Sequence, residues 1–328
     1  MSGSGTEGVS APYCMKDEDI TGKNLIPTVK SYDNQEFLRS AHGRLVRILC
    51  EFEEPAGRIR YHHIRSTVLV FGSARAMTAD EHQKTVERHK AALSAASSEQ
   101  ERVATQGELD RLHKTQWMCE WMDKVTELSK RIAEFSIEKK DKINASFSLL
   151  PDYFRPNLSA VNKDNAEEEQ LERFHDLVVT TGGGPGFMEA ANKGAATVPG
   201  AVTMGMGISL PFEKGLNRYV TPNLAFEFHY FFTRKFWMMY SCRAVVVAPG
   251  GFGTMDELFE LLTLRQTKKI PSFPVVLFCT KFWKTVVNWE ALVEFGTISK
   301  QEVQSICFTD SVDEALAFIR VFFESPPV

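Results

Sequence analysis

The amino-acid sequence predicts an α/β protein built on a parallel sheet with helices on both faces. From Arg65 onward, short apolar runs alternate with segments of helical character, and this alternation is typical of a parallel sheet. Several of the apolar runs end in glycine-containing turns that lead into a helix. In an open α/β sheet such turns meet at the carboxyl ends of the strands, where ligands bind.

Residues 1–31 are polar and are expected to form a mobile tail. A helix is predicted over 32–57, because Asp33 and Glu36 form a variant of the capping box and apolar residues follow at helical spacing. Pro55 is expected to end this helix. Its apolar face should pack on the core or on a second subunit.

A single Rossmann-like, nucleotide-binding domain is predicted over 65–325. A long segment separates its first strand, near Val68, from the next, near Leu177. We therefore expect a helical insertion at about 77–112, either a solvated arm or a helical hairpin, opened by Thr78 and Glu81. An apolar stripe from Trp117 to Phe135 predicts a core helix. A polar loop is expected at about 150–173.

The remaining elements follow as short alternating units. Strands are predicted at 177–181, 202–210, 224–228, 244–248, 275–278 and 306–308, and helices at 187–195, 231–240, from 254, 283–289 and 311–323.

The most informative motif is Pro-Gly-Gly-Phe-Gly-Thr-Met-Asp-Glu at 249–257, between an apolar strand and an apolar helix. Glycines allow a phosphate to approach the backbone, and a helix N-terminus attracts it. Glu257 would then stand beside a phosphate, an arrangement suited to chemistry on a phosphorylated small molecule. The alternative is an ordinary capping box in which Thr254 caps the helix and Glu257 bonds back to it.

Two further turns have the same strand–glycine–helix order. Gly182, Gly183 and Gly184 follow a buried strand, and three consecutive glycines indicate a backbone that closely approaches another group. The alternative is tight packing of strand against helix. The turn at Gly72 and Ser73 is a weaker example.

A basic pair, Arg234 and Lys235, interrupts an apolar and aromatic helix. Such side chains are rarely buried without a partner. Either their stems pack while the charged ends reach water, or Arg234 enters the cleft that holds Glu257.

These motifs together resemble the LOG (Lonely Guy) family, which hydrolyses cytokinin riboside 5′-monophosphates and is often labelled "lysine decarboxylase-like". The resemblance rests on GGGPG followed by MEAANKGA, on the Arg-Lys pair and on PGGxGTxxE; the surrounding residues resemble the longer, non-plant members. It implies a modified Rossmann fold, and Arg234 and Glu257 as the catalytic pair.

By the same resemblance, the remaining site residues bind the substrate and its 5′-phosphate. They are Gly72, Ser73, Gly182, Gly183, Gly184, Met188, Glu189, Lys235, Gly250, Gly251, Gly253 and Thr254. Glu189 stands where short plant-like members usually have glycine, which favours plain purine monophosphates over prenylated ones.

The expected reaction splits a purine nucleoside 5′-monophosphate, AMP or an N6-modified AMP, into free base and ribose 5-phosphate. Glu257 would stabilise the cationic sugar, hold a ribose hydroxyl or activate water. A nucleotide sensor or carrier without turnover is the alternative. Pyridoxal chemistry would need a Schiff-base lysine, and only Lys235 is placed for it. No cofactor or metal is expected, and the adjacent His62 and His63 are interpreted as surface residues.

Composition narrows the remaining classes. The net charge of −4 with no long basic run disfavours nucleic-acid binding. Six dispersed cysteines suit a reducing compartment. No apolar signal core or membrane-length stretch is present in the sequence, so a cytoplasmic protein is expected. The resemblance implies a homodimer or larger homo-oligomer. The aromatic residues of 226–232 would suit either a subunit interface or the core.

Overall fold

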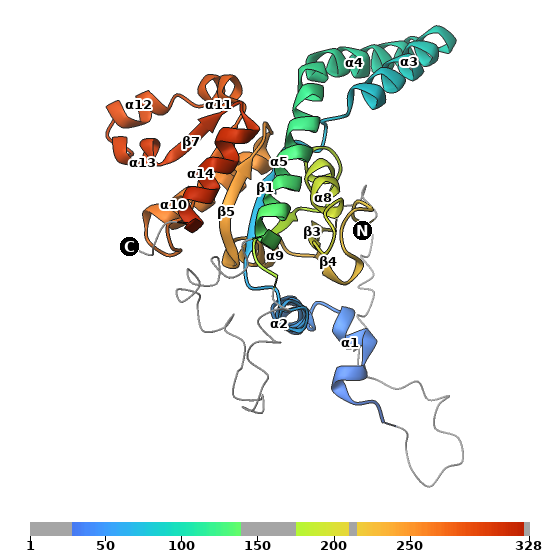
Figure 1. The fold of residues 1–328 in the computed structure, drawn as a ribbon. Coiled ribbons are helices and arrows are strands. Elements are labelled where there is room, and N and C mark those ends of the chain that lie inside the picture. The colour runs from blue at the N-terminus through green and yellow to red at the C-terminus, as the bar shows by residue number, and fades with distance from the viewer. Residues whose placement is uncertain (1–27, 139–174, 210–214, 325–328) are drawn as a thin grey trace, which may run out of the picture. The chain divides into compact units, whose positions relative to one another are not determined.

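The computed structural model describes residues 28–138, 175–209 and 215–324 (Figure 1). The chain divides into two compact units, Met1–Ala56 and Gly57–Val328. The polar loop predicted at about 150–173 and most of the predicted tail lie outside the described residues.

The first unit contains a 3-10 helix, η2 (Ser31–Asp33), the short helix α1 (Gln35–Arg39) and most of α2 (Arg44–Tyr61). The prediction of a single helix over 32–57 is therefore wrong: residues 40–43 separate two helices, and the second continues to Tyr61. Asn34, not Asp33, caps α1 by accepting from the Phe37 N–H at 3.1 Å. The Arg47 guanidinium donates to the carbonyls of Leu38 at 2.5 Å and Ser40 at 2.7 Å, which closes the break between the two helices.

Helix α2 continues through Pro55, where the sequence predicted its end. A proline removes one helical hydrogen bond and crowds the preceding turn. Ile59, one turn beyond, is fully buried, and this burial offsets the cost.

The second unit is built on a seven-stranded sheet in which every pairing is parallel, in the order β4-β3-β2-β1-β5-β6-β7. The prediction of a parallel α/β fold is confirmed. The direction of strand addition reverses between β1 and β5, which makes their carboxyl ends the switch point where such sheets bind ligands. The strands are β1 (Thr67–Phe71), β2 (Val178–Thr181), β3 (Thr203–Ile208), β4 (Ala225–Phe228), β5 (Cys242–Val247), β6 (Val275–Phe278) and β7 (Ile306–Thr309).

Three helices pack together on one face of this sheet: α5 (Cys119–Glu138), α8 (Phe187–Ala196) and α14 (Val312–Glu324) (Figure 1). Helix α8 approaches α5 closely because Gly194 has no side chain; a Cβ there would lie 2.0 Å from the Thr126 carbonyl oxygen. The crossover from β4 to β5 runs in the opposite direction, and right-handed crossovers therefore place α9 (Phe231–Tyr240) and α10 (Phe252–Gln266) on the other face.

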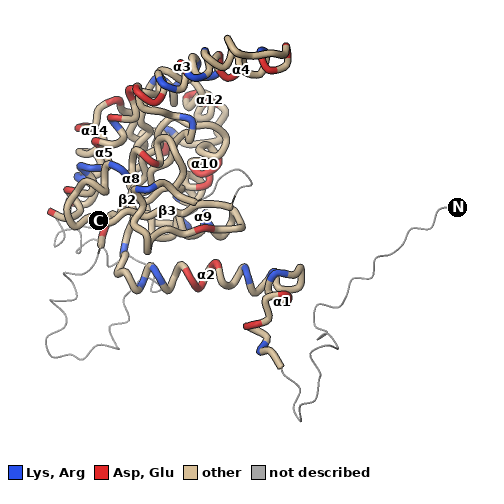
Figure 2. Tube along the Cα trace, turned by 90° about the vertical axis from the view of Figure 1, so that its right-hand side faces the viewer, with Lys and Arg blue, Asp and Glu red and all other residues tan. Residues whose placement is uncertain are grey.

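The predicted insertion is a helical hairpin, α3 (Ala79–Ala95) and α4 (Glu99–Thr115). Capping boxes at Thr78 and Ser98 begin its two helices. Lys and Arg mix with Asp and Glu along both helices (Figure 2). The hairpin also has a small apolar cluster of its own, made of Val86, Leu109 and Leu112.

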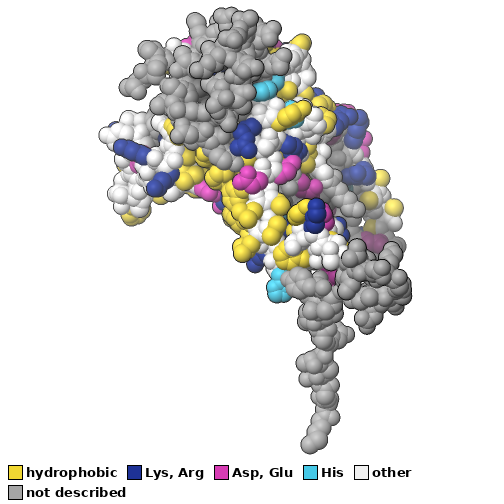
Figure 3. Space-filling model, turned by 90° about the horizontal axis from the view of Figure 1, so that it is seen from below, with side chains coloured by type: hydrophobic (Ala, Val, Ile, Leu, Met, Phe, Trp, Pro, Cys, Tyr) yellow, Lys and Arg dark blue, Asp and Glu magenta, His cyan; other side chains and the backbone are white. Residues whose placement is uncertain are grey.

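The remaining described elements are short. They are η3 (Gln116–Met118), η7 (Pro222–Leu224), α11 (Thr280–Val286), α12 (Trp289–Glu294) and α13 (Lys300–Gln304). No helix in the described part of the chain is both long and apolar enough to cross a membrane. On the face shown in Figure 3, hydrophobic side chains lie at the surface among charged ones.

Candidate active site

The three glycine turns lie side by side at the switch point, and Ser73 connects them. Its N–H donates to the Pro249 carbonyl at 2.9 Å, and its carbonyl accepts from the Phe187 N–H at 3.2 Å. Gly186 adopts a φ of 71°, and a Cβ there would lie 2.3 Å from the Ser73 carbonyl oxygen. Ser73 is therefore part of the framework of the site.

Helix α10 begins at Phe252, with Gly251 as its N-cap and no side-chain cap. The capping-box interpretation of Thr254 is wrong, because Thr254 lies inside the first turn and its side chain is buried. Among the described residues, nothing comes within 4 Å of a Cβ added at Gly251 or Gly253. The helix N-terminus is thus open, as binding of an anion requires.

Gly250 differs from these two glycines. A Cβ on Gly250 would lie 2.1 Å from Thr254 Oγ1 and 2.5 Å from Thr254 Cβ. Glycine is needed at this position for packing within the turn itself.

Arg234 and Glu257 come together from α9 and α10. Arg234 Nη2 donates to Glu257 Oε1 at 2.9 Å, and the two side chains are only 11% and 12% exposed. Arg234 Nη1 lies 3.6 Å from the position of a Cβ on Gly182, which connects this ion pair to the triple-glycine turn. Arg234 Nε is buried and has no hydrogen-bond partner among the described residues.

Burial raises the pKa of Glu257 to about 7. The Arg234 guanidinium opposes this rise, as does Lys235, whereas the Asp256 and Glu260 carboxylates add to it. A carboxyl group that is partly ionised near neutral pH suits proton transfer or the stabilisation of a developing cation.

The Lys235 ammonium group contacts two carboxylates in this structure. Its Nζ lies 2.6 Å from an Asp256 carboxylate oxygen and 2.7 Å from a Glu260 carboxylate oxygen. Both interactions tie α9 to α10 on either side of Glu257.

The triple-glycine turn packs closely against its own chain. A Cβ on Gly183, where φ is 73°, would lie 2.3 Å from Leu216 Cδ2, and Cβ atoms on Gly182 and Gly184 would lie within 3 Å of the Met188 side chain. At Gly183 the positive φ and the contact with Leu216 in the following loop account for the glycine, whereas at Gly182 and Gly184 the neighbour is the flexible end of Met188, so the predicted packing of strand against helix does not by itself explain these two. The thioether of Met188 is the side chain that the glycines at 182 and 184 accommodate.

Asn217 holds this turn in place, a role that the sequence did not indicate. Its amide Nδ2 donates to the carbonyls of Gly183 and Gly184, both at 3.1 Å, and to Asn192 Oδ1 at 2.9 Å. Asn217 is one of the residues that resemble the longer, non-plant family members, but a lone asparagine in a loop carries no periodic signal that would have indicated this role.

Glu189 lies in the first turn of α8 and lines a hollow of about 230 Å³ together with Gly183, Gly184 and Asn217. The turn that borders this hollow is the one that reaches Arg234 through Gly182. Gly72, by contrast, is held by packing, since a Cβ there would lie 2.7 Å from Phe187 Cβ.

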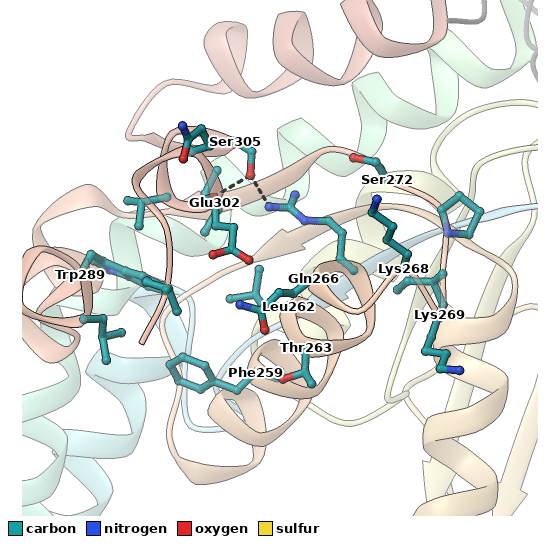
Figure 4. Close-up of a pocket in the computed structure, with 18 residues that line it drawn as sticks. Phe259, Leu262, Thr263, Gln266, Lys268, Lys269, Ser272, Trp289, Glu302 and Ser305 are labelled. Carbon is teal, nitrogen blue, oxygen red and sulfur yellow. Dashed lines mark hydrogen bonds between the residues drawn. The ribbon is translucent and has the colours of Figure 1, made fainter. Parts of the chain in front are cut away.

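A larger pocket of about 830 Å³ lies beside the C-terminal half of α10, away from the ion pair. Figure 4 shows Phe259 and Trp289 on one side of it, with Lys268 and Lys269 on the other. None of the predicted site residues lines this pocket. Within the described residues, no group of three or more His, Cys, Asp or Glu side chains is arranged to hold a metal ion.

Comparison with curated proteins gave no match. Residues 188–319, which include Met188, Glu189, the Arg234–Glu257 pair and all of α10, match the model of a protein family described as "Possible lysine decarboxylase".

Proposed function

We propose that this protein hydrolyses the N-glycosidic bond of a purine nucleoside 5′-monophosphate and releases the free base and ribose 5-phosphate. The observation that carries the proposal is the nearly buried Arg234–Glu257 pair, one turn inside the open N-terminus of α10. An open helix N-terminus, which could bind an anion, and a carboxyl group of raised pKa therefore lie together at the switch point of the sheet.

The 5′-phosphate would bind at the start of α10, where Gly251 and Gly253 leave space beside the backbone. Binding at this remote group positions the ribose and adds binding energy that a nucleoside lacks. Glu257, one turn further into the helix, would then face the sugar. As a carboxylate it would stabilise the oxocarbenium-like transition state or activate the attacking water. Arg234 would orient Glu257.

A nucleotide-binding protein without turnover is the second candidate. Burial of a carboxyl group costs free energy, and binding of an anionic phosphate gains nothing from a carboxylate beside it. The Arg234–Glu257 pair therefore favours catalysis over binding alone.

Decarboxylation through pyridoxal phosphate, which the family's description suggests, would need a neutral lysine. Burial lowers the pKa of Lys235, but its hydrogen bonds to Asp256 and Glu260 outweigh this effect and raise the pKa overall. Lys235 is thus held as an ammonium ion, which is not a nucleophile.

The test is incubation of the purified protein with AMP, GMP, IMP and adenosine, followed by separation of the products. We expect base and ribose 5-phosphate from monophosphates and no release from adenosine. Glu257→Gln keeps the hydrogen bond to Arg234 but removes the charge, and should lower kcat by about 10²-fold or more. Release at the wild-type rate by Glu257→Gln would refute the catalytic assignment. Tight nucleotide binding with no product from any monophosphate would favour the sensor.

The proposed assembly is a homodimer or a larger homo-oligomer. The aromatic segment 226–232 was expected to lie either in a subunit interface or in the core, and its residues differ in exposure. Phe226 and Phe228 are buried in the core, whereas Phe231 and Phe232 at the start of α9 are 54% and 53% exposed. Exposed aromatic residues beside the site are typical of subunit interfaces.

A further inference from the structure

Lys235 sits between two carboxylates that flank Glu257 on α10. Its side chain is only 15% exposed, whereas those of Asp256 and Glu260 are more open to solvent. Asp256 and Glu260 are four residues apart, so they project from the same side of α10 one turn apart. The ammonium group meets both at hydrogen-bond distance, 2.6 and 2.7 Å. We call this arrangement the α9–α10 bridge.

The bridge and the Arg234–Glu257 pair are formed by neighbouring residues. Arg234 and Lys235 are adjacent on α9, and Glu257 follows Asp256 directly on α10. Two consecutive cations of one helix thus meet carboxylates of the other. A shift of α9 along α10 that broke the bridge would also move Arg234 away from Glu257.

The bridge also balances charge around Glu257. The charged groups that act on its pKa are Arg234 and Lys235 from α9 and Asp256 and Glu260 from α10. The adjoining glycine turns, 182–186 and 249–253, contain no ionisable side chain. Without Lys235, two carboxylates beside Glu257 would lose their counter-charge, and ionisation of Glu257 would become more costly.

From this geometry we infer that Lys235 is a positioning residue: through Asp256 and Glu260 it holds α9 against α10 and sets the charge around Glu257, and it does not bind the substrate phosphate. This inference rests on the proposed function for its kinetic consequences. It departs from the substrate- or phosphate-binding role that the family resemblance implied for Lys235.

The test is the pH profile of kcat and KM in Lys235→Met. Loss of the bridge should move the acidic limb of kcat to higher pH by about one unit, because the pKa of Glu257 rises. At pH 7 the ionised fraction of Glu257, and with it kcat, should fall by about fivefold and recover at higher pH, while KM for the monophosphate stays within about twofold. Lys84→Met removes a lysine that is also paired with a carboxylate, at 2.6 Å from Asp80, but on the insertion hairpin. It should change neither parameter.

The triple variant Lys235→Met, Asp256→Asn, Glu260→Gln removes the bridge and its two negative charges together. If Lys235 acts through these carboxylates, the triple variant should bring the acidic limb back toward its wild-type position. A phosphate ligand would behave differently: KM would rise by about tenfold or more in both variants, with the limb unmoved, and this result would overturn the inference.

A titration of Glu257 separates failure of this inference from failure of the proposed function. Carboxyl carbon NMR, with Glu257→Gln to assign the resonance, follows this group without any substrate. If the wild-type protein hydrolyses no monophosphate but Lys235→Met still raises the pKa of Glu257, only the proposed function fails. An unchanged pKa in Lys235→Met would refute the bridge whatever the protein hydrolyses.

Discussion

At the scale of single residues, Glu257 connects the chemistry of the site to the stability of the fold. Burial raises its pKa from 4.5 to about 7 in the folded protein. Below pH 4.5 the group is protonated in both states and contributes nothing. Between pH 4.5 and 7 it ionises only in the unfolded chain, so the folded protein loses stability as pH rises.

Glu257→Gln removes the ionisable group and with it this pH-dependent loss of stability. The variant should therefore gain stability relative to the wild-type protein between pH 4.5 and 7, by at most about 3 kcal/mol, and the difference should then level off. Urea unfolding of both proteins from about pH 3 to about pH 8.5 measures this difference. Glu302→Gln is a control of opposite sign, because hydrogen bonds from Ser299 lower the pKa of Glu302; its wild-type advantage should shrink as pH falls below about 4.5. A difference for Glu257→Gln that does not change with pH would show that the buried carboxyl group is not perturbed.

Part of this residue-level arrangement could be predicted from the sequence. The motifs singled out Arg234 and Glu257, and the structure brings them together, while their catalytic roles remain predictions. The partners of Lys235 could not be predicted, because they depend on how α9 and α10 are aligned along each other. Asn217 was missed as a site residue for a similar reason, since its hydrogen bonds reach a turn that lies far from it in sequence.

At the scale of elements, the turn before α10 contains two kinds of glycine: one is needed for packing, and the others leave room for a ligand. Gly250→Ala would place a methyl group against Thr254 and should lower stability by about 1–3 kcal/mol. Gly253→Ala meets open space within a helical turn, so stability should stay level or rise by up to about 1 kcal/mol. If the phosphate binds here, Gly253→Ala should still lower kcat/KM by about tenfold or more.

Thermal unfolding and kinetics on the two variants together test this prediction. If Gly253→Ala is stable and keeps the wild-type kcat/KM, the phosphate does not bind at this turn. Both glycine variants must be measured, because Gly250→Ala alone could lose activity simply by distorting the turn.

The sequence predicted strands better than helix boundaries. Runs such as Val245-Val246-Val247 are buried on both faces and carry a strong local signal. Helix starts depend on what precedes them. Helix α10 begins two residues before Thr254 because the glycine turn already directs the chain into the helix, and α2 passes through Pro55 because residues beyond it are buried.

At the scale of the whole molecule, the alternation of strands and helices predicted the parallel sheet but could not supply the strand order. Order depends on where each crossover returns to the sheet, and the step from β4 back to the far side of β1 leaves no mark in the local sequence. That step creates the switch point. Helix α9, which carries Arg234, is part of this connection, because it follows β4 and precedes β5 along the chain.

The exposed aromatic surface of α9 leads to a prediction about assembly. Phe231, Phe232 and Phe236 all reach the surface, and burial of such side chains in an interface stabilises association. Phe232→Asp should therefore convert a wild-type oligomer into monomers, as measured by size-exclusion chromatography with light scattering. Phe295→Asp is the matched control, since Phe295 follows α12 and is even more exposed, at 84%. Dissociation by Phe295→Asp with no effect of Phe232→Asp would place the interface near the end of α12 instead. A wild-type monomer at all accessible concentrations would refute the proposed assembly, and the site would then have to function within one chain.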